Sequence, residues 1–150
     1  MKKLLTVVFV ISTFMSVVQA QKAPEDTQAS LFDRLGGTEG ITSIVDDAVA
    51  AHSINPVIKA RFLPYDEQPE RLALIKQHFV EFLSAGTGGT AQYTGRDMET
   101  THTGMNVSPE EFMALVDDFM MVLDKHKVTE QTKKDMLFIS WSLKGMIIGK

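Results

Sequence analysis

Apolar residues recur at three- and four-residue spacings along most of the chain after residue 30, which is the period of helices that bury one face. The most regular stretch runs from Pro69 to Ala85. Its apolar positions share one face: Leu72, Ile75, Phe79, Phe82 and Leu83. Two further stretches have the same period, one from Ser108 to about Lys127 and one from Thr129 toward the C-terminus. Because no segment of any length has the strand period, the pattern predicts an all-α domain over residues 31–150.

Short polar motifs mark where these helices begin and end. Thr38 is expected to cap a helix that ends before Asn55-Pro56, and Ser108 with Glu111 has the spacing of a capping box. Gly104 is expected to end a shorter helix. In the helix that Thr38 is expected to begin, the predicted inward positions are Ile41, Ile44, Val45, Ala48, Val49 and His52. Those in the last two helices are Phe112, Leu115, Val116, Phe119, Met120 and Leu123, and then Met136, Ile139, Leu143, Met146 and Ile147.

Residues 1–20 have the composition of a secretory signal peptide. Lys2 and Lys3 precede an apolar run that ends near Val18, and small residues follow up to Ala20. Thr and Ser interrupt the run, which makes it short for a permanent membrane span, although an uncleaved anchor is the alternative. We therefore expect cleavage before Gln21, a flexible leader over residues 21–30, no stable membrane anchor afterwards, and a periplasmic or secreted product.

Charge and cysteine content exclude several classes of partner and site. The whole chain has 15 Lys and Arg against 19 Asp and Glu, a net charge of −4. Without Lys2 and Lys3 the basic residues number 13, and the net charge becomes −6. Such a chain is a poor partner for nucleic acid or an anionic membrane surface. The absence of cysteine excludes thiol chemistry, Cys-based zinc sites and Cys-ligated iron–sulfur clusters.

Four histidines remain as candidates for chemistry. His126 lies in the last turn of its expected helix, where a favourable interaction with the helix C-terminus explains it. His52 is expected to be a satisfied histidine at the edge of the core, and His78 lies at the boundary between the apolar stripe and solvent. His102 follows Met98 by four residues, so both share one face of the short helix. Ordinary core packing is one explanation of this region, and a flat apolar cofactor held by one axial imidazole is the other.

Three segments carry a resemblance to a known family: LFDRLGGTEGI, LSAGTGGTAQYTGRDMETTHTGM and SPEEFMALVDDFM. In their order and spacing they resemble group I truncated haemoglobins, and the match runs from Leu31 to Lys150. The resemblance implies a two-over-two helical sandwich with one haem b per chain and His102 as the proximal iron ligand. It also implies that Phe62 wedges against the haem and that Arg96 or Lys76 pairs with a propionate. The apolar haem contacts that it implies are Met98, Phe112 and Leu115.

The chain departs from the family pattern on the side where gas ligands bind. The family usually has a tyrosine at the position of Val49, and its common glutamine positions are Ile75 and Phe79 here. These two side chains would then line the haem pocket as apolar contacts. His78 falls where some group I members supply a second axial histidine, so the resemblance makes His78 a candidate distal iron ligand. The alternative is that His78 faces solvent or a propionate.

The function expected from the resemblance is binding of a diatomic ligand, namely O₂, NO or CO, or redox chemistry at haem iron. Bulk oxygen storage and transport is the least supported role, because a missing hydrogen-bond donor weakens O₂ binding by about 1–3 kcal/mol. Nitric oxide detoxification and peroxidase-like haem chemistry would each need an unidentified electron donor. The alternative from another class is a haem-free, exported helical module that binds a different ligand in its apolar groove.

Overall fold

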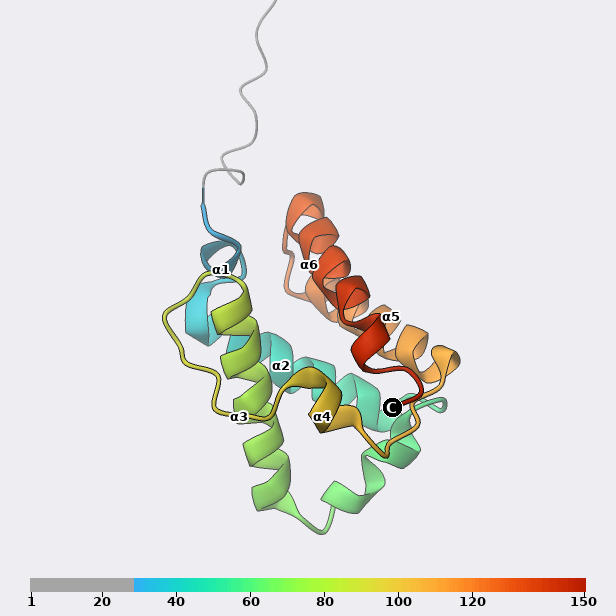
Figure 1. Ribbon diagram of the computed structural model, residues 1–150. Coiled ribbons are helices and arrows are strands. Elements are labelled where there is room, and N and C mark those ends of the chain that lie inside the picture. Colours follow the sequence, from blue (N-terminus) through green and yellow to red (C-terminus); the bar gives the residue numbers. More distant parts are fainter. Residues whose placement is uncertain (1–28) are drawn as a thin grey trace, which may run out of the picture.

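The computed structural model describes residues 29–150, so the expected signal peptide and most of the expected leader lie outside the described residues. Within that range the regular structure is helical, and two strand-like residues, Val107 and Ile148, form an isolated parallel bridge. Figure 1 shows the arrangement of the helices. Their bounds are α1 Leu31–Arg34, α2 Gly37–Ile54, η2 Lys59–Arg61, η3 Leu63–Tyr65, α3 Pro69–Gly86, α4 Met98–His102, α5 Pro109–Lys125, α6 Glu130–Ser142 and η4 Lys144–Met146. The expected all-α class is confirmed.

Two helix pairs build the body of the molecule. Helix α2 packs on α3, α5 packs on α6, and α2 also packs on α5, which joins the two pairs (Figure 1). The core lies where these helices meet, and its largest fully buried side chains include Ile41, Ile44, Leu123 and Met136. None of the residues between 29 and 150 forms a helix with the length and apolar character that a membrane span requires.

Most helix starts follow from local capping. The Ser108 hydroxyl accepts from Glu111 N at 3.1 Å while the Glu111 carboxylate accepts from Ser108 N at 2.8 Å, which confirms the predicted capping box. Thr129 caps α6 as predicted. The prediction that Thr38 caps α2 is wrong, because Gly36 adopts a left-handed conformation with φ of 87° and is itself the N-cap.

Two further expectations about buried positions are corrected. Helix α6 ends at Ser142, and the chain tightens into η4, which leaves Met146 36% exposed instead of inward. Leu115 is 38% exposed, because the buried face of α5 is rotated toward Asp118 and Val122. The sequence pattern did not separate these alternatives because apolar residues surround much of α5.

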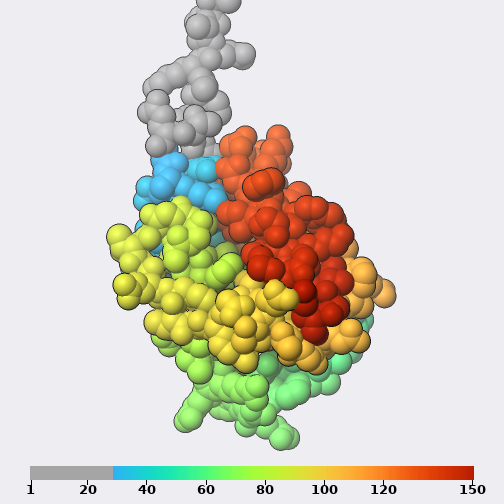
Figure 2. All heavy atoms as spheres, viewed as in Figure 1, coloured from blue at the N-terminus to red at the C-terminus, as the bar shows by residue number. Residues whose placement is uncertain are grey.

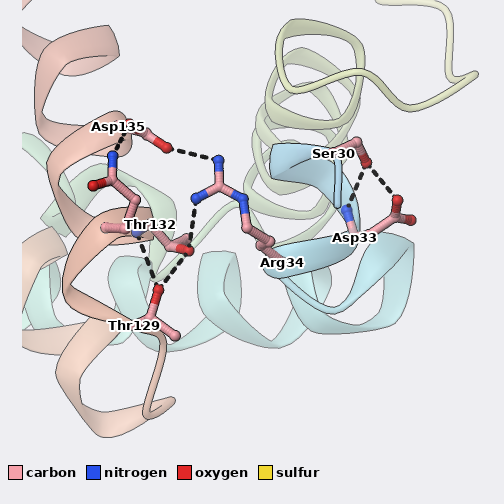
Figure 3. A network of polar contacts seen from close by, with 7 residues as sticks. Ser30, Asp33, Arg34, Thr129, Thr132 and Asp135 are labelled. Atoms are coloured by element: carbon pink, nitrogen blue, oxygen red, sulfur yellow. Dashed lines mark hydrogen bonds and ion pairs between the residues drawn. The ribbon is translucent and has the colours of Figure 1, made fainter. Parts of the chain in front are cut away.

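A polar network ties the start of the domain to α6. The Arg34 guanidinium donates to Asp135 Oδ2 at 2.6 Å and to Thr132 Oγ1 at 3.1 Å, across about 100 residues of sequence (Figure 3). Ser30, the last residue of the expected leader, caps α1 by accepting from Asp33 N. The first helix of the described residues therefore begins at this cap.

Candidate functional site

Helix α4 presents His102 with a defined arrangement of its two ring nitrogens. The helix starts at Asp97, whose carboxylate accepts from Thr100 N at 2.9 Å. One turn later, His102 Nδ1 lies 2.8 Å from the carbonyl oxygen of Met98. A carbonyl only accepts, so Nδ1 carries the proton and donates. The lone pair of the neutral ring is therefore on Nε2.

This arrangement is suited to holding one metal atom at an axial position. A histidine that binds a metal through one ring nitrogen usually donates from the other to a carbonyl or a carboxylate, which fixes the ring. Between residues 29 and 150, no three His, Asp or Glu side chains gather as ligands of a free metal ion. A single imidazole fixed in this way could serve as one ligand of a metal atom whose other ligands come from a cofactor.

The loop after His102 is clamped from two sides. Arg61, from the 3-10 turn before Phe62, donates to Met105 O at 2.7 Å. From the other side, the C-terminal residues act as a strap: Asn106 N donates to Lys150 O at 2.6 Å, and Gly149 N donates to Val107 O at 3.0 Å.

An ion pair extends the strap onto α4 itself. Lys150 Nζ donates to Glu99 Oε1 at 2.8 Å. Figure 2 shows the yellow residues of the α4 region beside the red C-terminal residues on one face of the molecule. The C-terminal strap therefore holds both α4 and the loop that follows it.

An ion pair holds the Arg61 side chain in place. Arg61 Nε and Nη2 donate to the two carboxylate oxygens of Glu111 at 2.7 and 2.8 Å, which is a bidentate ion pair. Hydrogen bonding by Arg61, with a further bond from Ser108, lowers the pKa of Glu111 to about 2. The same carboxylate raises the pKa of Arg61. One glutamate therefore both caps α5 and fixes the arginine that holds the loop after His102.

His78 lies on α3 beside an ordered loop. Its ring centroid is 6.1 Å from that of Tyr93, edge to face. The loop is held to α3 by Glu81, which accepts from the backbone and hydroxyl of Thr94 at 2.9 and 2.7 Å, and these bonds lower the pKa of Glu81 to about 2. A Cβ at Gly95 would lie 2.5–2.7 Å from the hydroxyl end of the Tyr93 side chain, so a larger residue there would have to displace that ring. The Tyr-Thr-Gly motif thus builds the wall next to His78.

The apolar candidates divide between the core and a partly accessible surface. Phe79 contacts Phe119 of the core at 6.2 Å between centroids, and Phe112 is buried with its ring 6.2 Å from that of Trp141. Leu115 is exposed, and the remaining candidates are partly buried: Phe62, Ile75 and Met98. Trp141 was not predicted as a site residue, although it lies on α6 close to Phe112.

The two cations expected to meet a propionate differ in whether a carboxylate of the domain already pairs with them. Lys76 is paired with Asp46 of α2 at 2.9 Å. Arg96 is exposed, and within residues 29–150 its guanidinium pairs with no carboxylate. Its backbone carbonyl accepts from the Tyr93 hydroxyl at 2.6 Å, which fixes the position of its backbone. Arg96 is therefore the better placed of the two for an acidic group of a ligand.

His52 is the buried histidine of the domain, with 2% exposure. Its Nδ1 lies 3.1 Å from Asp118 Oδ2, and Asn55 Nδ2 donates to Asp118 Oδ1 at 2.9 Å. Its Nε2 is buried and has no hydrogen-bond partner within residues 29–150, so the expectation of a satisfied histidine at the core edge was only half right.

Arg61 and Asp118 were missed by sequence reasoning for different reasons. Arg61 acts on carbonyls and a carboxylate more than 40 residues away, and no local pattern announces such a contact. Asp118 follows another acidic residue, Asp117, and the pair resembles a solvated face. Its burial depends on the rotation of α5 against α2, which is a property of the packed structure.

Comparison with known proteins extends over nearly all of the described chain. Residues 30–147 match the family described as bacterial-like globin. Group 1 truncated hemoglobin GlbN of Nostoc sp. (strain MUN 8820) is 27% identical over 122 residues, which are 81% of this chain and 99% of that protein. Group 1 truncated hemoglobin LI410 of Chlamydomonas moewusii is 27% identical over 121 residues, which are 79% of this chain and 68% of that protein.

Solved structures agree on the fold. The truncated hemoglobin of Tetrahymena pyriformis in its Fe(III) form superposes with a TM-score of 0.74 at 20% identity, covering 81% of this chain and 100% of that one. The 2/2 hemoglobin of Synechococcus sp. PCC 7002 gives 0.68 at 22% identity, covering 77% and 94%. The two-over-two sandwich expected from the sequence is thereby confirmed.

Proposed function

We propose that this chain, which belongs to the bacterial-like globin family as a truncated 2/2 globin, holds haem iron through His102. Globins bind haem, and they bind diatomic gases at its iron. Haem b, bound without a covalent link and one per chain, is the form that we propose here. His102 would hold the haem, and the bound haem would supply gas binding and redox chemistry at its iron.

The observation that carries this proposal is the state of His102. Donation from Nδ1 to the Met98 carbonyl at 2.8 Å leaves Nε2 free and fixes the plane of the ring. The loop that follows is held by Arg61 and by the C-terminal strap, so the imidazole is preoriented. Arg96 is exposed and has no carboxylate partner among residues 29–150, so it supplies a cation for a haem propionate.

On the opposite side we propose an apolar ligand pocket with His78 at its rim. Val49, Ile75 and Phe79 offer no hydrogen-bond donor at the three family positions where polar residues are common. CO and NO need less polar assistance than O₂ does, so the pocket favours NO handling or redox chemistry over oxygen storage. An imidazole at this rim has the iron as its attractive partner, and His78 would occupy the sixth position when no gas is present. An external electron donor would then sustain turnover.

The N-terminal sequence supports an exported globin. Lys2, Lys3, the apolar run and the small residues before Gln21 have the order of a cleavable signal peptide. We propose that the domain works in the periplasm or outside the cell. The absence of cysteine suits an oxidising compartment, since no thiol is exposed to oxidation there.

Replacing His102 tests the proposal directly. His102→Ala, purified after expression with haem supply, should lose stable haem or retain haem that exogenous imidazole restores to the wild-type spectrum. Its melting temperature should also fall, because a cofactor that binds the native state stabilises it by mass action. His126→Ala is the matched control, since His126 pairs with Asp47 and should leave haem binding intact. Full haem retention with an unchanged ferrous spectrum in His102→Ala would contradict the assignment.

An absorbance spectrum of the wild-type protein separates the globin from a haem-free binding module. A Soret band is expected after haem supply. A folded, haem-supplied protein without that band would overturn the proposed function.

A further inference from the structure

A buried polar group lies on the α2 side of the domain and has no partner for one of its atoms. His52 is 2% exposed, and its Nε2 makes no hydrogen bond among the described residues. Leaving a buried polar atom unsatisfied is costly, and native structures do so rarely. This histidine is therefore not explained by packing alone.

The state of the ring follows from its neighbours. Asp118 is buried as well, and it receives a hydrogen bond from Asn55 at 2.9 Å on one oxygen, while His52 Nδ1 lies 3.1 Å from the other. Burial lowers the pKa of His52, which keeps the ring neutral at pH 7. The single proton of a neutral ring that faces a carboxylate lies on Nδ1. Nε2 is therefore a bare acceptor.

The position of His52 places this acceptor next to the proposed ligand pocket. His52 follows Val49 by three residues on α2, so both lie on the same side of the helix. Val49 occupies the position where the family usually has its ligand-binding tyrosine. The His52 ring also lies 5.7 Å from the Phe62 ring, and Phe62 is the residue proposed to wedge against the haem. Val49 and Phe62 are thus two residues near His52 that the proposed haem site would place on its ligand side.

We propose that His52, oriented by Asp118 and Asn55, is a hydrogen-bond acceptor of the ligand pocket and a determinant of its ligand specificity. This inference rests on the proposed haem-binding function. An acceptor favours ligands that carry a proton, such as water or hydrogen sulfide. It does nothing for O₂, which needs a donor. The pocket would therefore favour ligands that carry a proton, whereas a pocket with a tyrosine, which donates a hydrogen bond, favours O₂.

Nuclear magnetic resonance of the wild-type haem protein tests the position and state of His52 without any mutation. In the ferric cyanide form, the ring protons of a histidine beside the pocket should shift strongly relative to the diamagnetic ferrous CO form. The nitrogen shifts of the CO form should identify a protonated Nδ1 and a bare Nε2. Ring protons that do not move between the two forms, or a proton found on Nε2, would overturn the inference.

One substitution should reverse the polarity of the ring. In Asp118→Asn, the introduced amide keeps an oxygen for Asn55 and turns its NH₂ group toward His52 Nδ1. Nδ1 must then accept, and the proton moves to Nε2. The pocket gains a donor, so O₂ release should slow by roughly fivefold or more. The affinity of the ferric protein for hydrogen sulfide should fall.

The measurement is best made in a His78→Ala background, which leaves the sixth position open. Asp47→Asn is the matched control, because Asp47 lies on the same helix as His52 but pairs with His126 at 2.7 Å and is not part of the His52 cluster. It should leave O₂ release and sulfide affinity unchanged. Equal effects of Asp118→Asn and Asp47→Asn would refute the specificity role.

Failure of this inference is distinguishable from failure of the proposed function. A protein without a Soret band after haem supply would refute haem binding itself. A protein with that band whose His52 protons are insensitive to the iron would refute only the role of His52. If Asp118→Asn does not fold, the wild-type resonances still decide the question.

Discussion

Removing the Arg61 side chain's charge should loosen the loop after His102 and lower the stability of the whole domain. Arg61→Met keeps the length of the aliphatic stem but deletes the bidentate bond to Glu111 and the bond to Met105 O. Ser108 N still donates to Glu111, so the capping box remains. The substitution therefore isolates the clamp from the helix start.

The magnitude follows from the ionisation of Glu111. Its pKa falls from 4.5 to about 2, which sets an upper limit of about 3.4 kcal/mol at 1.36 kcal/mol per unit. Part of that shift comes from Ser108, and the Arg61 side chain is 33% exposed, so solvent screens the pair. We expect Arg61→Met to lower the free energy of unfolding by about 1–1.5 kcal/mol at pH 7. For a domain of this size the melting temperature should fall by about 5 °C.

The pH dependence has a definite sign. A carboxyl whose folded pKa is depressed stabilises the fold above its unfolded pKa and loses that contribution as the pH falls toward the folded pKa. The difference between wild type and Arg61→Met should therefore be constant above about pH 5. It should shrink between 4.5 and about 2.

Urea unfolding followed by circular dichroism, at fixed ionic strength from pH 7 to pH 3, measures this difference. Arg71→Met is the matched control, because Arg71 is exposed and, among the described residues, its guanidinium interacts only with nearby ones, donating to Gln68 and lying 5.6 Å from the Tyr65 ring centroid. Its effect should stay within about 1 kcal/mol and should not share the pH profile. A double-mutant cycle with Glu111→Gln should give a coupling of about 1 kcal/mol. Identical stabilities of wild type and Arg61→Met at pH 7, or a gap that persists unchanged at pH 3, would refute the reasoning.

Three other predictions concern the sixth position, the N-terminus and the turn after His102. His78→Ala should convert a low-spin ferric and ferrous spectrum to high-spin and speed CO binding, and a wild type that is already high-spin would contradict this. The exported protein should begin at Gln21 by intact mass, whereas a full-length product that resists salt extraction from membranes would indicate an anchor. Gly104→Ala should cost about 1–2 kcal/mol in urea unfolding because its φ is +85°, while Gly145→Ala, which has open space and no positive φ, should be neutral within about 0.5 kcal/mol.

Helix positions were predictable where local chemistry decides them. The capping box at Ser108, the cap at Thr129 and the short helix ending at His102 each depend on residues within four positions of one another. Thr38 failed as a cap because the left-handed Gly36 starts α2 earlier, and the sequence does not distinguish a glycine that ends one helix from one that begins the next.

Contacts between distant segments were not predictable in the same way. The Arg61 clamp and the C-terminal strap join segments separated by more than 40 residues, and both depend on how η2 and the end of the chain pack. The resemblance to truncated haemoglobins supplied His102 as a candidate. The structure supplied the tautomer of that histidine, which no sequence pattern contains.

The two sides of the proposed site are stabilised by different forces. Helix α2 buries six side chains and carries His52 within the core, whereas α4 has no buried residue and is held through polar contacts at the surface. Segments with few buried contacts open locally at lower free energy than the core does. Acid neutralises Glu111 only as the pH falls toward about 2, which weakens the Arg61 clamp, and high salt screens the Lys150–Glu99 pair that holds the strap. The His102 side should therefore open before the α2 side does, so that loss of the proximal contact precedes global unfolding.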